Sequence, residues 1–353
     1  IILLLIILSF ITFKFVETPF RNYKIIGSRI FFLMISIFIL IIIFISSISI
    51  MNNGFLKRYS DNAILINMFN DKNDVVFDQD NNSCHERNVS NICILEKVEN
   101  LNIKTNIIFL GDSLMAYLAK PIYNNIKEED YIFYFLTKGA CPYTPYLSQD
   151  TISLCTLNDN IERRNFILDQ KKSVIIINNW LRWYLTGKYT YEDNHIIDDN
   201  ILRMNDLKYG ENEENNKKII NSIKGSIKEL LDYGHKVILI YPTPETNLNK
   251  QVTNFLLDKS KKLNKVQFDS FVNNYSISYK DFISNNDIIF NLYDSINHEN
   301  LLRIYPHKFM CQNNKCRLFD ADNIFMIDQS HLSSYGNKII SREIINKIKN
   351  IKW

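Results

Sequence analysis

Apolar runs long enough for a membrane helix occupy the start of the chain and are absent from the rest of it. Residues 1–13 are almost wholly apolar, and residues 30–51 form a second run of 22 residues without a charge. At about 1.5 Å per residue a helix over 30–51 is roughly 33 Å long, enough to cross a bilayer. We therefore predict a membrane-spanning helix at 30–51. Residues 1–13 are interpreted as the end of a membrane helix whose beginning is missing.

From about residue 105 the pattern changes. Short apolar runs alternate with segments whose apolar residues recur at helical spacing. The runs predict buried strands at 106–110, 131–135, 174–177, 236–240 and 287–292, and a shorter one at 324–327. The spacing predicts helices at 114–127, 160–171, 216–233 and 334–349. Such alternation is typical of an α/β fold whose mostly parallel sheet is covered on both faces.

Two segments do not follow either pattern. Residues 52–104 are polar and irregular, and are interpreted as a linker and extension. Residues 180–215 are aromatic and then acidic, and are interpreted as an insertion near the site.

Charge is distributed unevenly along the 353 residues. The formal net charge is +3, but residues 1–60 contain six basic residues and one acidic residue. The remainder therefore carries no basic surplus, which argues against a nucleic-acid partner. The basic residues of the loop at 14–29 place that loop in the cytoplasm and everything beyond residue 52 outside it.

Six cysteines fall into three close pairs. An even number outside the membrane suggests disulfides. Among 15 possible connectivities we choose the local one, because the stretches within each pair look like loops; a reduced, buried set is the alternative. The absence of Cys-x-x-Cys pairs and of a histidine cluster argues against a metal site, and we expect no cofactor. The predicted pairs are Cys84–Cys93, Cys141–Cys155 and Cys311–Cys316.

A serine stands where the first predicted strand gives way to a helix. The apolar run 107–110 ends in Gly111, Asp112 and Ser113, and helical spacing follows. This turn lies at the carboxyl edge of a parallel sheet, where open α/β folds bind ligands. The serine amide also lies near the positive end of the helix, which favours developing negative charge. By itself the tripeptide fits a turn and helix cap equally well.

A second polar motif follows the short strand predicted at 324–327. Asp328 precedes His331 by three residues, just before the C-terminal helix. At this spacing the carboxylate can bond one imidazole nitrogen and leave the other free to take a proton from a serine. A helix cap with a solvated histidine is the alternative.

Together the two motifs resemble the first and last blocks of the SGNH hydrolase family, and imply its three-layer fold. In that family the nucleophilic serine comes early and an Asp-x-x-His comes near the C-terminus. The resemblance implies that Ser113 is the nucleophile, that His331 is the general base and that Asp328 orients the imidazole.

The same resemblance suggests donors for the oxyanion. The family uses the serine amide, here that of Ser113, a glycine amide after the second strand and an asparagine side chain after the third. Gly139 follows the predicted strand 131–135 and fits the glycine. The usual Gly-x-Asn-Asp block is absent, and Asn178 or Asn179 remains for the third donor. Because side chains alternate along an extended chain, we expect only one to point inward, and favour Asn179.

The residues that follow Asn179 have two interpretations. Trp180, Arg182, Trp183 and Tyr184 could contact a sugar ring and its hydroxyls, or the tryptophans could pack in the core.

The loop between the apolar runs carries a further resemblance. Its Val-Glu-Thr-Pro-Phe-Arg-Asn segment, at 16–22, resembles the end of the membrane domain of the acyltransferase-3 family. Some of those enzymes continue into one more helix and an extracytoplasmic SGNH domain. The resemblance implies that 1–51 ends such a membrane domain and that 105–353 is the SGNH domain. It also implies a multi-pass protein of the bacterial inner membrane, with its SGNH domain in the periplasm or outside the cell.

Three functions are compatible with these motifs. The first is transfer of an acyl group, expected to be acetyl, to a hydroxyl of a cell-surface polysaccharide such as lipopolysaccharide. The glycan would then be the acceptor, and acetyl-CoA would be the donor through the missing membrane domain. The second is a carbohydrate O-acetylesterase, and the third is an inactive glycan-binding module.

Overall fold

The computed structural model describes two compact units, Ile1–Tyr59 and Ser60–Trp353. The described residues are 9–10, 12–18, 28–52, 55, 74–96, 105–149, 155–188, 201–204, 207–245, 259, 263–274, 276–317, 319–320 and 323–352.

The first unit contains one long apolar helix, α3, at Ser28–Met51. Its stretch Phe32–Met51 has a mean hydropathy of 2.9 and no buried residue, so the described part of the unit has one helix able to span a membrane. This agrees with the helix predicted at 30–51. A short π-helix, η1, covers Phe13–Glu17, and most of the predicted helix at 1–13 lies outside the described residues.

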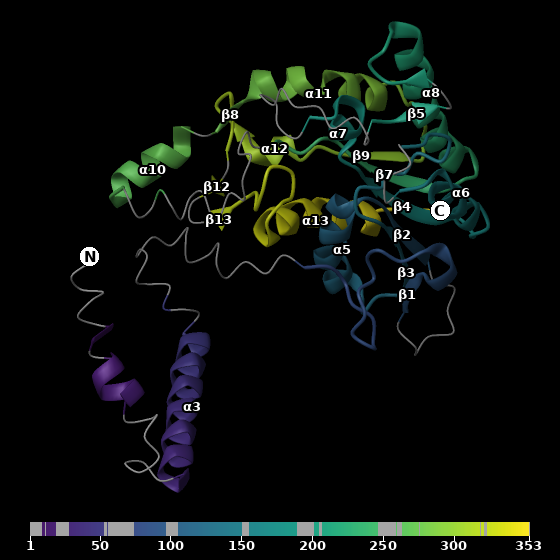
Figure 1. The fold of residues 1–353 in the computed structure, drawn as a ribbon. Helices are drawn as coiled ribbons and strands as arrows, with labels where there is room; N and C mark the ends of the chain where they lie inside the picture. The colour runs from purple at the N-terminus through teal and green to yellow at the C-terminus, as the bar shows by residue number, and fades with distance from the viewer. Residues whose placement is uncertain are drawn as a thin grey trace. The chain divides into compact units, whose positions relative to one another are not determined.

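A six-stranded sheet with the order β1-β3-β2-β4-β7-β9 forms the centre of the second unit (Figure 1). Five strands are parallel, and β1 pairs antiparallel with β3 at one edge. The strands are β1 Cys93–Glu96, β2 Thr105–Gly111, β3 Tyr131–Thr137, β4 Ser173–Asn178, β7 Lys236–Ile240 and β9 Leu301–Ile304.

Helices cover both faces of this sheet, as predicted. Successive side chains of a strand point to opposite faces, so Ile107 and Phe109 pack with one helix layer and Ile108 and Leu110 with the other. The first layer contains α5 Ser113–Ile126 and α13 Ser334–Lys349. The second contains α6 Leu157–Leu168, α7 Leu181–Thr186, α8 Glu213–Asp232 and α11 Tyr279–Asp294. The result is a three-layer α/β sandwich.

Shorter elements connect these layers. They are η3 Val89–Asn91, β5 Arg203–Met204, β6 Leu207–Lys208, α10 Lys265–Asn274, β8 Ile277–Ser278, α12 His307–Met310, β10 Cys311–Gln312, β11 Lys315–Cys316, β12 Phe319–Asp320 and β13 Asn323–Ile324.

The strand predicted at 287–292 is wrong. These residues belong to α11, which Ser278 caps by accepting a hydrogen bond from the Asp281 N–H. Phe282, Ile289 and Leu292 are buried along one side of that helix. A short apolar run fits a strand and a buried helix equally well. The fifth parallel strand is β9 instead, whose four residues are too few to stand out in an isoleucine-rich chain.

Two other segments also differ from expectation. The strand predicted at 324–327 is reduced to β13, which pairs only with β12, because the chain turns back and Met326 bridges to Leu332. The segment 52–104, expected to be a linker and extension, supplies the edge strand β1.

The three predicted disulfides are all present, and they are Cys84–Cys93, Cys141–Cys155 and Cys311–Cys316. Together with the apolar helix α3, they indicate an extracytoplasmic domain with a membrane anchor.

Candidate active site

Ser113 is the first residue of α5, directly after β2. The chain reverses here at Gly111, whose φ is +148°, and a Cβ at that position would lie 2.0 Å from the Asn178 carbonyl oxygen. Only glycine fits this approach between the ends of β2 and β4. Since the first N–H groups of a helix have no partner within the helix, the Ser113 amide is suited to bind an oxyanion.

The structure brings Ser113, His331 and Asp328 together across 218 residues of sequence. The Ser113 Oγ lies 2.9 Å from Nε2 of His331, and Nδ1 of His331 lies 2.8 Å from Oδ2 of Asp328. This is the spacing required for a serine hydroxyl, a general base and an orienting carboxylate.

Asp328 is held in its orientation by its own loop. Its Oδ1 accepts hydrogen bonds from the backbone N–H groups of Ser330 at 2.9 Å and His331 at 2.7 Å. Burial raises the pKa of Asp328, but the hydrogen bond and charge of His331 outweigh burial and hold that pKa below its ordinary value. The carboxylate is therefore ionised at neutral pH and favours the imidazole tautomer with a proton on Nδ1.

Asp112 joins the serine turn to the end of β4. Its Oδ1 accepts from the Leu114 N–H at 2.9 Å, and its Oδ2 accepts from the Trp180 N–H at 2.7 Å and the Tyr184 hydroxyl at 3.0 Å. Burial raises the pKa of Asp112, and these three hydrogen bonds oppose the rise. Because Trp180 follows Asn179, the carboxylate fixes the position of Asn179 relative to Ser113.

We expect Asp112→Asn to weaken folding. An amide NH₂ cannot accept from Trp180 or Tyr184, and each buried group left unpaired costs about 1–3 kcal/mol. The free energy of unfolding should fall by about 2–4 kcal/mol, measured by urea denaturation of the purified chain. Asp232→Asn is the control, because Asp232 is 63% exposed on α8. A loss below about 0.5 kcal/mol in Asp112→Asn would contradict the bracing role.

Asn179 lies beside the serine turn. Its Oδ1 accepts from the Tyr143 N–H at 3.2 Å and lies 3.0 Å from the position of a Cβ on Gly111. With Oδ1 bonded in this way, the Nδ2 protons of Asn179 are the ones available to a ligand. Asn178 is the last residue of β4 and is buried. The choice of Asn179 over Asn178 as the oxyanion donor stays a prediction.

Gly139 follows β3, but its amide is occupied. The Gly139 N–H donates a hydrogen bond of 2.8 Å to Oε1 of Glu86, which lies in the loop between Cys84 and Cys93. This contact was not foreseen from the sequence, because Glu86 belongs to a polar segment without periodicity.

The residues after Asn179 are mostly inside the protein. Trp180, Arg182 and Trp183 are at most 9% exposed. The Arg182 guanidinium forms an ion pair with Glu245, which also accepts from the Trp180 indole at 2.8 Å. Core packing is therefore the better of the two interpretations of these aromatic residues.

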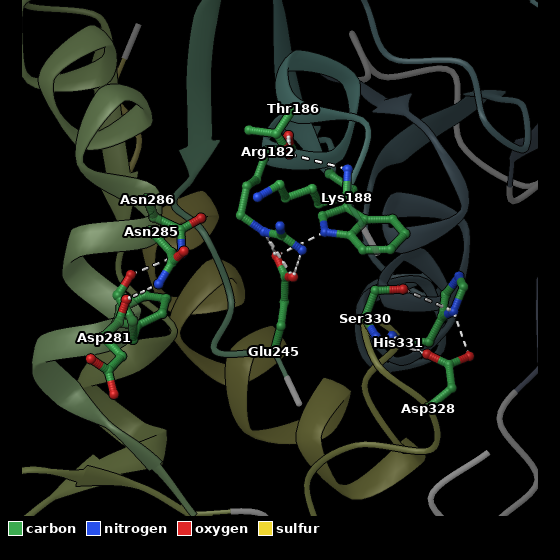
Figure 2. Close-up of polar contacts among 12 residues, drawn as sticks. Arg182, Thr186, Lys188, Glu245, Asp281, Asn285, Asn286, Asp328, Ser330 and His331 are labelled. Carbon is green, nitrogen blue, oxygen red and sulfur yellow. Dashed lines mark hydrogen bonds and ion pairs between the residues drawn. The ribbon is translucent and has the colours of Figure 1, made fainter. Parts of the chain in front are cut away.

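The Arg182–Glu245 pair lies close to the loop that carries His331. Figure 2 shows it between α11 and the loop that carries Asp328, Ser330 and His331. A cavity of about 20 Å³ is bordered by Arg182, Glu245, Asn179 and Ser330. That volume holds about one water molecule, so this space cannot receive a sugar.

A larger cavity borders Tyr117, a ring neighbour of His331. Tyr117, one turn after Ser113 on α5, meets the His331 ring edge-on, with centroids 5.3 Å apart. A cavity of about 110 Å³ borders Tyr117 and extends between Lys120 and Lys338. Lys120 is paired with Asp74 at 2.9 Å, whereas Lys338 is exposed and forms no ion pair with a described residue. Neither Tyr117 nor Lys338 was singled out from the sequence.

A cavity of about 500 Å³ lies at the opposite, amino-terminal edge of the sheet, bordered by Lys236, Glu299 and Lys352. It is remote from the three residues of the relay, so volume alone does not identify the site.

Comparison with protein families identifies the fold. A model described as SGNH domain (fused to AT3 domains) matches residues 79–346, more than half of the chain. The chain belongs to this family. The matched residues include β1. No curated protein matches the chain.

Several solved structures are similar to the SGNH domain at low sequence identity. The periplasmic domain of a Salmonella ser. Paratyphi A lipopolysaccharide acetyltransferase is 20% identical, with a TM-score of 0.44 over 76% of this chain and 91% of that chain. A putative acylhydrolase from Bacteroides fragilis is 13% identical, with a TM-score of 0.38 over 74% and 93%. The acetyl xylan esterase AlAXEase is 16% identical, with a TM-score of 0.38 over 69% and 99%.

Proposed function

We propose that this SGNH domain transfers an acyl group, in particular acetyl, to a hydroxyl of a cell-surface glycan through an ester on Ser113. The observation that carries the proposal is the continuous relay of Ser113, His331 and Asp328. Two observations support a donor delivered from the membrane. The domains of this family are fused to acyltransferase-3 membrane domains, and the apolar helix α3 is able to span a membrane.

The chemistry follows from the relay in two halves. The Ser113 Oγ attacks the acyl carbonyl while its proton passes to Nε2 of His331, and that proton then leaves with the donor's leaving group. In the second half the acceptor hydroxyl attacks the ester carbon and gives its proton to Nε2. The bond to Ser113 breaks, and its oxygen recovers the proton.

In both halves of the reaction, hydrogen-bond donors must stabilise the negative charge that develops on the carbonyl oxygen. The Ser113 amide and Nδ2 of Asn179 are the proposed donors in the resting structure, with the Gly139 amide as a third once it is free. Each such donor contributes roughly 10²–10³ in rate.

The cavity bordered by Tyr117 and Lys338 is the proposed place for the acceptor sugar. The attacking hydroxyl must come within about 3 Å of Nε2, and Tyr117, which lines this cavity, contacts the imidazole that carries that atom. An aromatic ring and an ammonium group suit a sugar that carries negative charge.

An esterase would use the same residues, with water as the acceptor. The two are separated by incubating the purified chain in detergent micelles with 4-nitrophenyl acetate and candidate bacterial glycans. With a transferase, acetylated sugar forms in place of free acetate when one of the glycans is added, because the sugar hydroxyl replaces water as the acceptor. If free acetate remains the product with every glycan, the esterase is favoured.

We expect Lys338→Ala to lower the ratio of transfer to hydrolysis with an anionic glycan. Loss of one exposed ionic contact is worth up to about 1 kcal/mol, or roughly fivefold in the KM for the acceptor. The measurement is the partition between acetylated glycan and free acetate. Lys352→Ala, which removes a lysine at the opposite edge of the sheet, is the control. An unchanged KM in Lys338→Ala would place the acceptor elsewhere.

A further inference from the structure

Glu86 holds the amide that the proposed reaction would use. Its Oε1 accepts from the Gly139 N–H at 2.8 Å, and a Cβ added to Gly139 would lie 2.5 Å from the same oxygen. An amide has one proton to donate. While Glu86 is in place, Gly139 therefore cannot stabilise an oxyanion on the Ser113 ester.

The backbone around Glu86 is attached to the end of β3. Glu86 has a φ of +68°, a left-handed conformation that is uncommon for a residue with a side chain. Its N–H donates to the Thr137 carbonyl at 3.0 Å. Nδ1 of His85 lies 3.1 Å from the Thr137 hydroxyl oxygen, and the neighbouring Cys84 is bonded to Cys93 of β1. The segment 84–86 is thus fixed where Gly139 begins its turn.

The carboxylate itself is less enclosed than this backbone. The side chain of Glu86 is 51% exposed, and Nε2 of His85 lies 3.2 Å from its Oε1. The hydrogen bond with His85, opposed by burial and aided by the Gly139 amide, lowers the pKa of Glu86. The side chain is therefore a charged acceptor that solutes can reach, on a backbone that does not need to move.

We propose that Glu86 determines the choice between a glycan and water as acyl acceptor, by withholding the Gly139 amide until a polyol binds the carboxylate. This inference rests on the proposed function. Neighbouring hydroxyls of a sugar donate to the two oxygens of Glu86 and draw it away from Gly139. The freed amide then binds the oxyanion, so the ester on Ser113 reacts faster with a bound sugar than with water.

The alternative is that Glu86 only holds the Gly139 turn in place. The two roles predict opposite effects of removing the carboxylate. A withheld donor returns to the reaction when Glu86 is truncated, and one such donor is worth roughly 10²–10³ in rate. If Glu86 only supports the Gly139 turn, its removal instead lowers the rates of both hydrolysis and transfer.

The test compares Glu86→Ala and Glu86→Gln with the parent chain in detergent micelles. We expect the kcat for hydrolysis of 4-nitrophenyl acetate to rise at least about tenfold in Glu86→Ala, with KM little changed. Glu86→Gln should rise less, because its amide oxygen still accepts from Gly139 but without charge. Glu299→Gln, an exposed glutamate at the opposite edge of the sheet, is the control.

A second readout uses small alcohols as acceptors. In the parent chain glycerol should be acetylated in preference to methanol at equal hydroxyl concentration, and Glu86→Ala should lose that preference. A folded Glu86→Ala whose hydrolysis is unchanged or slower, or which keeps the preference for glycerol, would overturn the inference. Ser113→Ala is assayed in parallel, because turnover that survives in that variant would contradict the proposed function instead.

Discussion

Ser113→Ala is expected to abolish turnover of an acetyl ester while the domain stays folded. The Oγ of Ser113 is the atom that would carry the acyl group, and its 2.9 Å contact with Nε2 of His331 has no substitute in alanine. Loss of the nucleophile in a serine relay costs roughly 10⁴-fold or more in kcat. The measurement is the steady-state release of 4-nitrophenol by the purified chain.

Ser295→Ala is the matched control for this variant. Ser295 ends α11, and its hydroxyl donates only to the Leu292 carbonyl nearby. Circular dichroism should show the same fold in both variants. If folded Ser113→Ala keeps near-parental turnover, the serine mechanism is wrong, and another group of the chain carries out the reaction.

Loss of the base should be almost as severe, and loss of the orienting carboxylate less so. His331→Ala leaves the Ser113 hydroxyl without a proton acceptor, and we expect a decrease of about 10⁴-fold in kcat. Asp328→Asn keeps an oxygen for the loop amides but presents an NH₂ to Nδ1, which disfavours the productive tautomer. We expect a smaller decrease in kcat for this variant than for His331→Ala, measured in the same assay.

Stability in acid distinguishes the role of Asp328 from that of the imidazole. Because the pKa of Asp328 is lowered in the folded protein, its contribution to stability is complete above the ordinary aspartate pKa. That contribution is lost as the pH falls through the lowered value. Asp328→Asn should therefore weaken the decrease in stability at acidic pH, followed by urea denaturation. Asp232→Asn, at an exposed position of α8, is the control. An Asp328→Asn variant that loses stability in acid as steeply as the parent chain would contradict this contribution of Asp328.

The features predicted correctly from the sequence are those that short segments encode. The strand that ends at Gly111 is apolar and buried from Ile107 to Leu110, and the glycine and serine mark the turn that follows. The close cysteine pairs could likewise be matched, because each closes a short loop. The segment 287–292 failed because buried helices and buried strands share the same isoleucine-rich composition.

The unpredicted parts of the candidate site depend on long-range packing. Glu86 meets Gly139 across 53 residues, and this contact exists only because the unforeseen strand β1 pairs with β3. Tyr117 could be placed on a helix beside Ser113, but its contact with His331 requires α13 to pack against α5. No local pattern marks such partners.

The most direct measurement of the central claim is to find the acyl group on the protein. The purified chain is mixed with 4-nitrophenyl acetate, quenched in acid within the first turnover, digested and analysed by mass spectrometry. We predict an acetyl ester on Ser113, formed faster than it is lost to water and discharged when a glycan acceptor is added. An active chain that carries no acetyl group on Ser113, or carries it on another residue that is needed for turnover, would contradict this account.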